Sequence, residues 1–417
     1  MEKINDNLNL LNEAVMNADK DLAPVFDVFD RNCEYNSKKV LDSFIKNRVS
    51  QSDFTDINGY GYYDGGRDKL EKIFAEILDA EDALVRPQIM SGTNAIALTL
   101  TGLLHHGDTI LSVSGLPYDS LRGIIGLCGN SRLSLKYNGV NYEQIDLKGS
   151  DFDYEKIERR IKKGGVTMVA IQRSRGYANR KSLTLNKIEK VVSLIKSIDK
   201  NVVVFCDNCY GELVEKHEPC YYGVDVVAGS LMKNLGGGVA SSGGYVAGRA
   251  DLVAEVAERL TSPCIGKELG ANFNQNLSFY KGLYLAPNAV RNALKTAAFA
   301  AYVLEKTGFN GISPKYDEER TDIIQTVELN SEKNLVKFCQ GMQEASPVDA
   351  FVNVEPGDMP GYPDQEVMAA GTFTQGSTIE LSCDGPVTAP YTAYLQGGLT
   401  YEYGKLGIIS AVRKMFG

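Results

Sequence analysis

Short apolar runs rich in β-branched residues recur between about residue 83 and residue 248, and they alternate with longer amphipathic stretches. Each run is too short for an ordinary helix and is typical of a strand buried on both faces. The alternation predicts βαβ units, in which a mainly parallel seven-stranded sheet lies between two layers of helices. The chain is therefore expected to have a three-layer α/β fold. The runs are ALVRPQIM, DTILSV, RLSLKY, VTMVAIQRS, VVVFCDN, VDVVAGSLM and GGYVAG.

The N-terminal sixty residues have a different pattern. Apolar residues recur at helical spacing over residues 5–19 and 35–48, with LAPVFDVFD between them. We expect residues 1–60 to form a helical arm. This arm can pack either on a neighbouring subunit or on its own domain.

The C-terminal part also departs from the alternating pattern. An alanine-rich helix is predicted near residues 287–307, and the sequence after it combines one helical stretch with strand-like runs. This pattern predicts a large domain over residues 61–305 and a smaller α+β domain over residues 306–417.

Charge and hydropathy exclude several classes of partner. The formal net charge of -9 argues against a nucleic-acid surface, because phosphate binding needs clustered Lys and Arg. No apolar run is long enough to span a bilayer, and the N-terminus lacks the pattern of a secretory signal. We expect a cytoplasmic protein with a small-molecule partner.

The cysteines and histidines give little support to a metal site. Cys206 and Cys209 form the only close pair among eight cysteines, and no second pair or nearby histidine completes a zinc site. His105, His106 and His217 are dispersed along the chain. We prefer to interpret the two cysteines as small side chains at the end of a buried strand, and we predict no metal.

Three of the predicted strands are followed by residues that suit one anionic ligand. Ser91, Gly92, Thr93 and Asn94 come between a strand and a helix and would present N–H groups at the positive end of that helix. Asp207 and Lys233 each follow a later strand. In an open α/β sheet, ligands bind beyond the carboxyl ends of the strands, so these groups are expected to converge.

Pyridoxal phosphate needs this combination of groups. Its aldehyde bonds to a lysine, its phosphate suits a helix N-terminus, and its pyridine nitrogen needs a carboxylate. Each element alone has an ordinary alternative: a capped helix start, a strand-end cap for Asp207, and a solvated loop lysine for Lys233. Together they favour the cofactor, with the glycines after Lys233 giving the backbone room beside it. No P-loop and no dinucleotide-binding glycine motif competes with this interpretation.

The order SGTNAIA, FCDNCYGELVE, GSLMKNLGGG resembles the fold-type-I group of pyridoxal-phosphate enzymes. Within that group the chain is similar to the cysteine and methionine metabolism branch, which contains the cystathionine lyases and methionine gamma-lyase. QRSRGYANRKSLT, DMPGYP and GTFTQGSTIELSCDGP further resemble a bacterial subfamily labelled methionine gamma-lyase-like or aluminium-resistance protein. The resemblance covers nearly the whole chain.

The resemblance implies roles for particular residues. Lys233 matches the Schiff-base lysine, and Asp207 matches the partner of the pyridine nitrogen. Ser230 matches a hydroxyl that adds a phosphate contact. Tyr118 matches an aromatic residue that stacks on the cofactor ring, although a tyrosine in a surface turn is the alternative. The phosphate loop corresponds to Gly92, Thr93 and Asn94.

The chain departs from the branch at two places. The branch binds the substrate carboxylate through a C-terminal arginine, but here the only arginine beyond residue 320 is Arg413, near the chain end. Arg173 and Arg175 are the expected substitutes, because a guanidinium can hold a carboxylate with two parallel bonds; either can instead face the cofactor's phenolate oxygen or solvent. Tyr60 and Arg67 are candidates for reaching a neighbouring subunit's phosphate, with a tyrosine- and glycine-rich turn as the alternative.

The resemblance predicts a carbon-sulfur lyase that acts on a sulfur amino acid of the methionine or cystathionine type and releases a 2-keto acid, ammonia and a thiol. Aldol cleavage or transamination of another amino acid uses the same cofactor and is not separated by the motifs, nor is β from γ elimination. A non-catalytic metal-tolerance protein is the third possibility. The resemblance also implies a homodimer or homotetramer.

Overall fold

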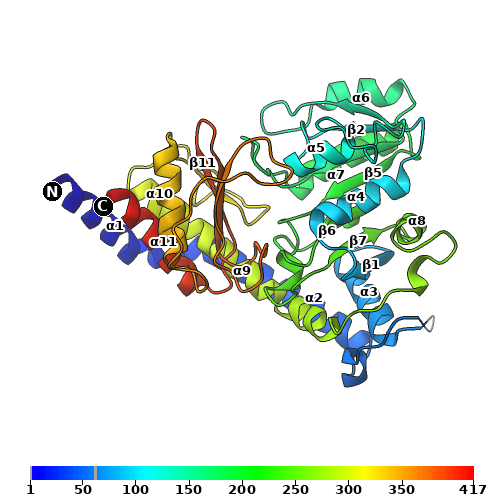
Figure 1. Ribbon diagram of the computed structural model, residues 1–417, viewed down its shortest axis with the longest axis horizontal. Helices are drawn as coiled ribbons and strands as arrows, with labels where there is room; N and C mark the ends of the chain where they lie inside the picture. The colour runs from blue at the N-terminus through cyan, green and yellow to red at the C-terminus, as the bar shows by residue number, and fades with distance from the viewer. Residues whose placement is uncertain (1, 61–62) are drawn as a thin grey trace.

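The computed structural model describes residues 2–60 and 63–417. Gly61 and Tyr62 lie outside the described residues, so the predicted neighbouring-subunit segment GYGYYDGGRDKLEKIF is described only in part. The larger part of the molecule contains a sheet with helices on both faces, and a smaller part lies at the other end of a long helix (Figure 1).

A seven-stranded sheet, in the order β1-β7-β6-β5-β4-β2-β3, forms the centre of the larger part. β2 to β6 run parallel to one another, whereas β7 is antiparallel to β1 and β6. The prediction of a mainly parallel seven-stranded sheet is confirmed. The strands are β1 Asp82–Arg86, β2 Thr109–Ser112, β3 Asn141–Gln144, β4 Met168–Gln172, β5 Val203–Asp207, β6 Val226–Ser230 and β7 Gly244–Gly248.

One predicted strand is wrong. RLSLKY, residues 132–137, forms turns, and the third strand is the polar segment NYEQ that follows it. Leu133 is 82% exposed, so the run lacks the continuous buried surface that a strand in this sheet needs. β3 lies at the sheet edge, where one side of a strand stays solvated, and it therefore carries no apolar signal.

Successive residues of a strand point to opposite faces of the sheet, and each face has its own helices. In β5, Val204 and Cys206 belong to the hydrophobic core that contains α3, α6 and α7, whereas Phe205 belongs to the core that contains α4, α5 and α8. The helices are α3 Gly65–Ile77, α4 Gly92–Leu103, α5 Asp119–Ile125, α6 Tyr154–Lys162, α7 Leu185–Ile198 and α8 Ala250–Leu260.

The smaller part is built on a second sheet, which is fully antiparallel and has the order β8-β11-β10-β9. Its elements confirm the expected α+β architecture, but it has two helices rather than one, because the chain ends in α11. The elements are β8 Gln325–Glu328, α10 Glu332–Gln343, β9 Glu366–Ala369, β10 Ser382–Pro386, β11 Thr392–Gln396 and α11 Tyr401–Phe416.

The N-terminal arm packs against its own chain. It consists of α1 Glu2–Asp21 and α2 Ala23–Lys46, so LAPVFDVFD is mostly helical rather than a link between helices. Pro24 lies in the first turn of α2, where a missing N–H costs nothing. Both helices contact the 31-residue helix α9, Asn276–Lys306, and Lys295 of α9 forms a salt bridge with Asp30 at 2.7 Å.

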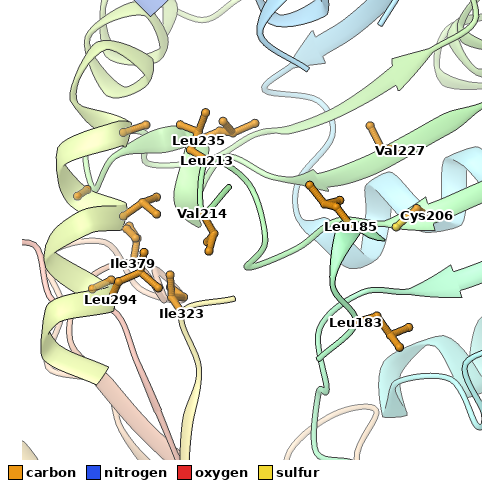
Figure 2. Close-up of a cluster of buried hydrophobic side chains, with 14 of the residues drawn as sticks. Leu183, Leu185, Cys206, Leu213, Val214, Val227, Leu235, Leu294, Ile323 and Ile379 are labelled. Atoms are coloured by element: carbon orange, nitrogen blue, oxygen red, sulfur yellow. The ribbon is translucent and has the colours of Figure 1, made fainter. Parts of the chain in front are cut away.

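Buried side chains join the two parts of the molecule. Figure 2 shows Val227 of β6 and Leu235 after it in the same cluster as Leu294 of α9 and Ile379 before β10. The segment that follows β6 and contains Lys233 is therefore packed against both α9 and the C-terminal part.

Candidate active site

Lys233 lies three residues beyond the end of β6 and is half-buried. Its Nζ is 3.7 Å from the centroid of the Tyr210 ring, so the ammonium is held by a cation–π contact. Burial works to lower the pKa of this ammonium, but Cys209, Tyr210 and Asp207 outweigh that effect and raise the pKa. The lysine is therefore a half-buried, partnered cation rather than a solvated loop residue.

The glycines after Lys233 have a different role from the expected one. Gly237 has a φ of +55°, and a Cβ added there would lie 2.3 Å from the backbone oxygen of Gly282 in α9. A Cβ at Gly238 would collide with Leu399 of the C-terminal part. These glycines let the lysine loop pack directly against other chain segments.

Asp207 ends β5 and is 9% exposed. Its Oδ1 accepts a hydrogen bond from the backbone N–H of Cys209 at 3.1 Å. Burial raises the pKa of this carboxyl, and the effect exceeds the opposing influence of Lys233 and the Cys209 N–H. A cationic ring nitrogen placed beside Asp207 would therefore stabilise its ionised form.

The start of α4 lies against the same two strand ends. A Cβ added at Gly92 would be 3.1 Å from Cys209 Sγ and 3.3 Å from the Cβ of Ser230, the last residue of β6. Ser91 caps the helix by accepting a hydrogen bond from the N–H of Asn94 at 3.1 Å. The predicted phosphate loop, Asp207 and the strand that leads to Lys233 thus meet at one edge of the sheet.

The polar side chains at this edge of the sheet already have hydrogen-bond partners within the protein. Thr93 Oγ1 is 3.0 Å from Ser120 Oγ of α5, and Ser230 Oγ accepts from the N–H of Met232 at 3.1 Å. The Asn94 side-chain oxygen accepts from the N–H of Met90 at 3.2 Å. These contacts orient the loop so that the first N–H groups of α4 face the site.

The residues fit pyridoxal phosphate. The positive end of α4 suits a phosphate, the partly desolvated Asp207 carboxylate suits a protonated pyridine nitrogen, and Lys233 supplies the amine. Gly92 lacks the side chain that would crowd Cys209 and Ser230, where a phosphate would approach the helix. Cys206 and Cys209 are free thiols, and the described residues contain no cluster of three or more metal-ligating side chains.

Tyr118 belongs to an aromatic cluster rather than to a surface turn. Its hydroxyl is 2.6 Å from that of Tyr362, and its ring centroid is 5.8 Å from that of Tyr177. The Tyr177 ring in turn lies 4.8 Å from that of Tyr394 in β11. Burial raises the pKa of Tyr118 well above its ordinary value, so its hydroxyl keeps the proton.

A cavity of about 520 Å³ opens beside this cluster, between the large domain and the C-terminal segment. Its walls carry charges of both signs. The cations are on the segment after β4 and on α5, whereas most of the acids come from residues 364–366. Charged and aromatic residues of the lining include Tyr118, Arg122, Arg175, Tyr177, Arg180 and Glu366.

Arg173 does not face this cavity. Its side chain is fully buried, and its donors bind Asn208 at 2.7 Å and Glu215 at 2.9 Å. A second acid, Glu218, lies 3.6 Å away. The prediction that Arg173 holds a substrate carboxylate is therefore not supported, because its guanidinium is committed to acids inside the large domain.

Arg175 and Arg180 do line the cavity, and both bind uncharged acceptors. Arg175 donates to Thr326 Oγ1 at 2.6 Å and to Ser313, and Arg180 donates to the carbonyl of Gln172 at 2.8 Å. Burial lowers the pKa of Arg180 to about 10, with Asp322 and Asp207 opposing the fall and Arg175 adding to it, which still leaves the side chain charged at neutral pH. A carboxylate in the cavity would be well placed to neutralise these cations.

Tyr60 and Arg67 are not brought together with Lys233 in this chain. Tyr60 is 68% exposed, while Arg67 is buried and donates to Asp68 at 3.0 Å and to the carbonyl of Gly270 at 3.3 Å. Their contact with a neighbouring subunit remains a prediction.

Sequence reasoning missed four residues that border the site. Tyr177, Arg180 and Tyr362 lie inside RSRGYANR and DMPGYP, two of the segments that carried the family resemblance, so attention to every side chain in those segments could have found them. Asp384 lies inside a third such segment, GTFTQGSTIELSCDGP, but its place beside the site depends on the pairing of β9, β10 and β11.

Comparisons with known proteins agree with this fold. The family model for methionine gamma-lyase matches residues 11–416. The uncharacterized protein YnbB of Bacillus subtilis (strain 168) is 46% identical over 405 residues, which cover 97% of this chain and 96% of that protein.

No described helix is both long and apolar enough to cross a membrane.

Solved structures of related proteins have the same fold. A carbon-sulfur lyase involved in aluminium resistance from Clostridium novyi NT is 44% identical, with a TM-score of 0.92 and coverage of 98% of this chain and 96% of that one. A Listeria monocytogenes protein, provisionally described as a cystathionine beta-lyase involved in aluminium resistance, is 43% identical, with a TM-score of 0.93, and covers 98% of this chain and 100% of its own. The pyridoxal-5'-phosphate-dependent protein YhfS of Escherichia coli shares the fold at 17% identity, with a TM-score of 0.61 over 90% of this chain and 94% of that one.

Proposed function

The chain belongs to the methionine gamma-lyase family, and from this premise we propose that it is a pyridoxal-phosphate-dependent carbon-sulfur lyase acting on a sulfur amino acid. The products would be a 2-keto acid, ammonia and a thiol. The observation that supports the proposal is the convergence of Asp207, the start of α4 and the end of the strand that leads to Lys233, near a cavity in which Arg175 and Arg180 form hydrogen bonds with uncharged acceptors.

We propose a task for each residue of the site. Bound pyridoxal phosphate supplies an electron sink for the charge that develops at the substrate Cα. Asp207 keeps the ring nitrogen positively charged. In its neutral form Lys233 Nζ would take the proton from Cα, and the Tyr118 hydroxyl would donate a hydrogen bond to the departing sulfur. Arg175 and Arg180 orient the substrate by binding its carboxylate.

The purified, cofactor-loaded protein is expected to release both a thiol and a 2-keto acid without an added keto-acid acceptor. Cystathionine, methionine, homocysteine and cysteine are the substrates to compare, with colorimetric assays for both products. The keto acid formed distinguishes β from γ elimination. A requirement for an acceptor would instead indicate transamination, and release of an aldehyde would indicate aldol cleavage; either outcome would contradict the lyase proposal.

Arg180→Gln is expected to raise the KM for the sulfur amino acid by about tenfold to a hundredfold, because the substrate carboxylate would lose a charge-assisted hydrogen bond. The kcat should change much less, since the variant leaves Lys233 and Asp207 in place. Lys333→Ala, a change at an exposed position of α10, is the control and should leave both constants unchanged. A fall in kcat of the same size, with no change in KM, would contradict the proposal that Arg180 binds the substrate carboxylate.

A further inference from the structure

A second cavity, of about 400 Å³, lies between the start of α7 and residues 314–322, the segment that precedes β8. It is separate from the cavity beside Tyr118, and Arg175 is the residue that borders both. The other residues that line it have no part in the site proposed above. Its volume is within the range of small-molecule sites.

Arg320 is a buried cation in the wall of this cavity and is only 6% exposed. Its Nη2 donates to Gln325 Oε1 at 2.6 Å and to the carbonyl of Ala297 at 3.3 Å. Its Nε and Nη1 have no hydrogen-bond acceptor among the described residues. Buried donors of a charged side chain gain free energy from an acceptor, and an anion is the strongest acceptor they can have.

The surroundings of Arg320 favour an anion over a neutral acceptor. Burial lowers the pKa of Arg320 to about 10, while Asp322 and Glu318 oppose the fall and Arg175 adds to it. The side chain therefore stays charged at neutral pH although it is desolvated. A negative charge placed against it would offset that desolvation.

The first turn of α7 forms another wall of the cavity. Thr184 caps this 14-residue helix by accepting a hydrogen bond from the N–H of Lys187 at 3.4 Å. The N–H groups of a first turn make the start of a helix attractive to anions. Lys187 and Lys190 also line the cavity and, being three residues apart, are neighbours on one face of the helix. Lys187 donates to the carbonyl of Ser150 at 2.5 Å, and Lys190 is exposed, so neither lysine is held by an acid.

The acids of the cavity are mostly engaged elsewhere. Glu318 forms a salt bridge with Lys181 at 2.8 Å. Asp322 Oδ2 accepts a hydrogen bond from the Ser174 hydroxyl at 2.7 Å. Glu319 is exposed, so solvent screens its charge. The cavity therefore keeps a positive side, made by Arg320 and the start of α7.

We propose that this cavity binds a small molecule that carries a phosphate monoester, with Arg320 and the first turn of α7 holding the phosphate group. A phosphate suits these residues better than a carboxylate does, because it carries more negative charge and three acceptor oxygens. Lys187 and Lys190 would add charge around it. The ligand would contact both parts of the molecule, since α7 covers the large sheet and Arg320 precedes β8. This site is distinct from the start of α4, where the cofactor's phosphate is proposed to bind.

The probe for the test is glycerol 3-phosphate, titrated by calorimetry into the cofactor-loaded protein so that the start of α4 is already occupied. Saturable binding is expected, and it should weaken as salt is added, because the lysines are partly solvated. Glutarate at the same concentration should fail to displace the probe. Absence of binding would overturn the proposal, and displacement by glutarate would overturn the choice of phosphate.

Two variants test the residues assigned to the site. Arg320→Gln is expected to weaken probe binding by about tenfold to a hundredfold, and Lys187→Gln by about threefold to fivefold. Lys200→Gln is the matched control, because it removes an equal charge just beyond the other end of α7, and it should leave the affinity within about twofold. The melting temperature shows whether Arg320→Gln is folded. Unchanged affinity in Lys187→Gln, which is only half-buried, would contradict the proposal even if Arg320→Gln did not fold.

The same titrations separate this cavity from its neighbours. Arg320 also borders a cavity beside α2, but Lys187 does not, so a loss confined to Arg320→Gln would place the anion there and overturn the proposal. Arg180→Gln should leave probe binding unchanged, because Arg180 lines only the cavity beside Tyr118. A loss of binding in Arg180→Gln would show that the probe occupies the substrate site instead. None of these titrations needs turnover, so their outcome does not depend on the lyase activity.

Discussion

Lys233→Ala is expected to lower turnover of the preferred sulfur amino acid by at least about a thousandfold. The variant removes the one amine that lies at the end of β6 against Tyr210, and with it the group that moves the proton at Cα. The measurement is thiol and keto-acid release at saturating substrate, together with the visible absorption of the cofactor-loaded protein. That absorption should differ from the wild-type spectrum, because alanine cannot bond to the cofactor's aldehyde.

Two controls separate this loss from a folding defect. The melting temperature of Lys233→Ala shows whether the variant is folded, and Lys233→Arg retains a cation over the Tyr210 ring without a primary amine. Arginine should therefore restore part of any lost stability but none of the turnover. Wild-type turnover in either variant would disprove the role assigned to Lys233.

Arg173→Met should destabilise the protein by about 3–5 kcal/mol, the cost of leaving a buried charge without its partner. Glu218 is fully buried and faces the Arg173 guanidinium at 3.6 Å. Burial already raises the pKa of Glu218, while Arg173 opposes the rise, so the variant should push that pKa higher. Urea unfolding of the cofactor-free protein measures the change.

Arg175→Met is the matched comparison, because Arg175 is also buried but donates to Ser313 and Thr326 rather than to acids. Its loss breaks no salt bridge among the described residues, so it should cost at least about 1 kcal/mol less than the loss of Arg173. Sulfur-amino-acid binding should show the reverse order, with Arg175→Met impaired and folded Arg173→Met nearly normal. Similar free energies of unfolding for the two variants would show that Glu215 and Glu218 do not need Arg173 as a counter-charge.

The sheet was predictable because its strands are buried on both faces and so carry continuous apolar runs. RLSLKY misled that reasoning because its apolar residues alternate with polar ones in a segment of turns, and the polar edge strand β3 had no signal of its own. The helix α2 was predicted too short, because Pro24 and the segment around it resemble a break, although proline is tolerated in a first helical turn.

For the site, order along the chain was enough to place Lys233, Asp207 and Gly92 at neighbouring strand ends. It could not choose between Arg173 and Arg175, which are two residues apart but have different partners: one binds acids inside the large domain, and the other borders the cavity. The placement of Glu366 and Asp384 on one face was beyond sequence reasoning, because it depends on the register of an antiparallel sheet.

The loop that carries Lys233 is attached to both parts of the molecule. The N–H of Thr378, in the C-terminal part, donates to the carbonyl of Met232 at 3.2 Å, and the glycines after Lys233 contact α9 through backbone atoms. A rotation of the C-terminal part away from the sheet would therefore break a hydrogen bond at the residue next to the lysine. The position of the Lys233 amine is thus tied to the packing of the two parts, and a change that separated them would also displace Lys233.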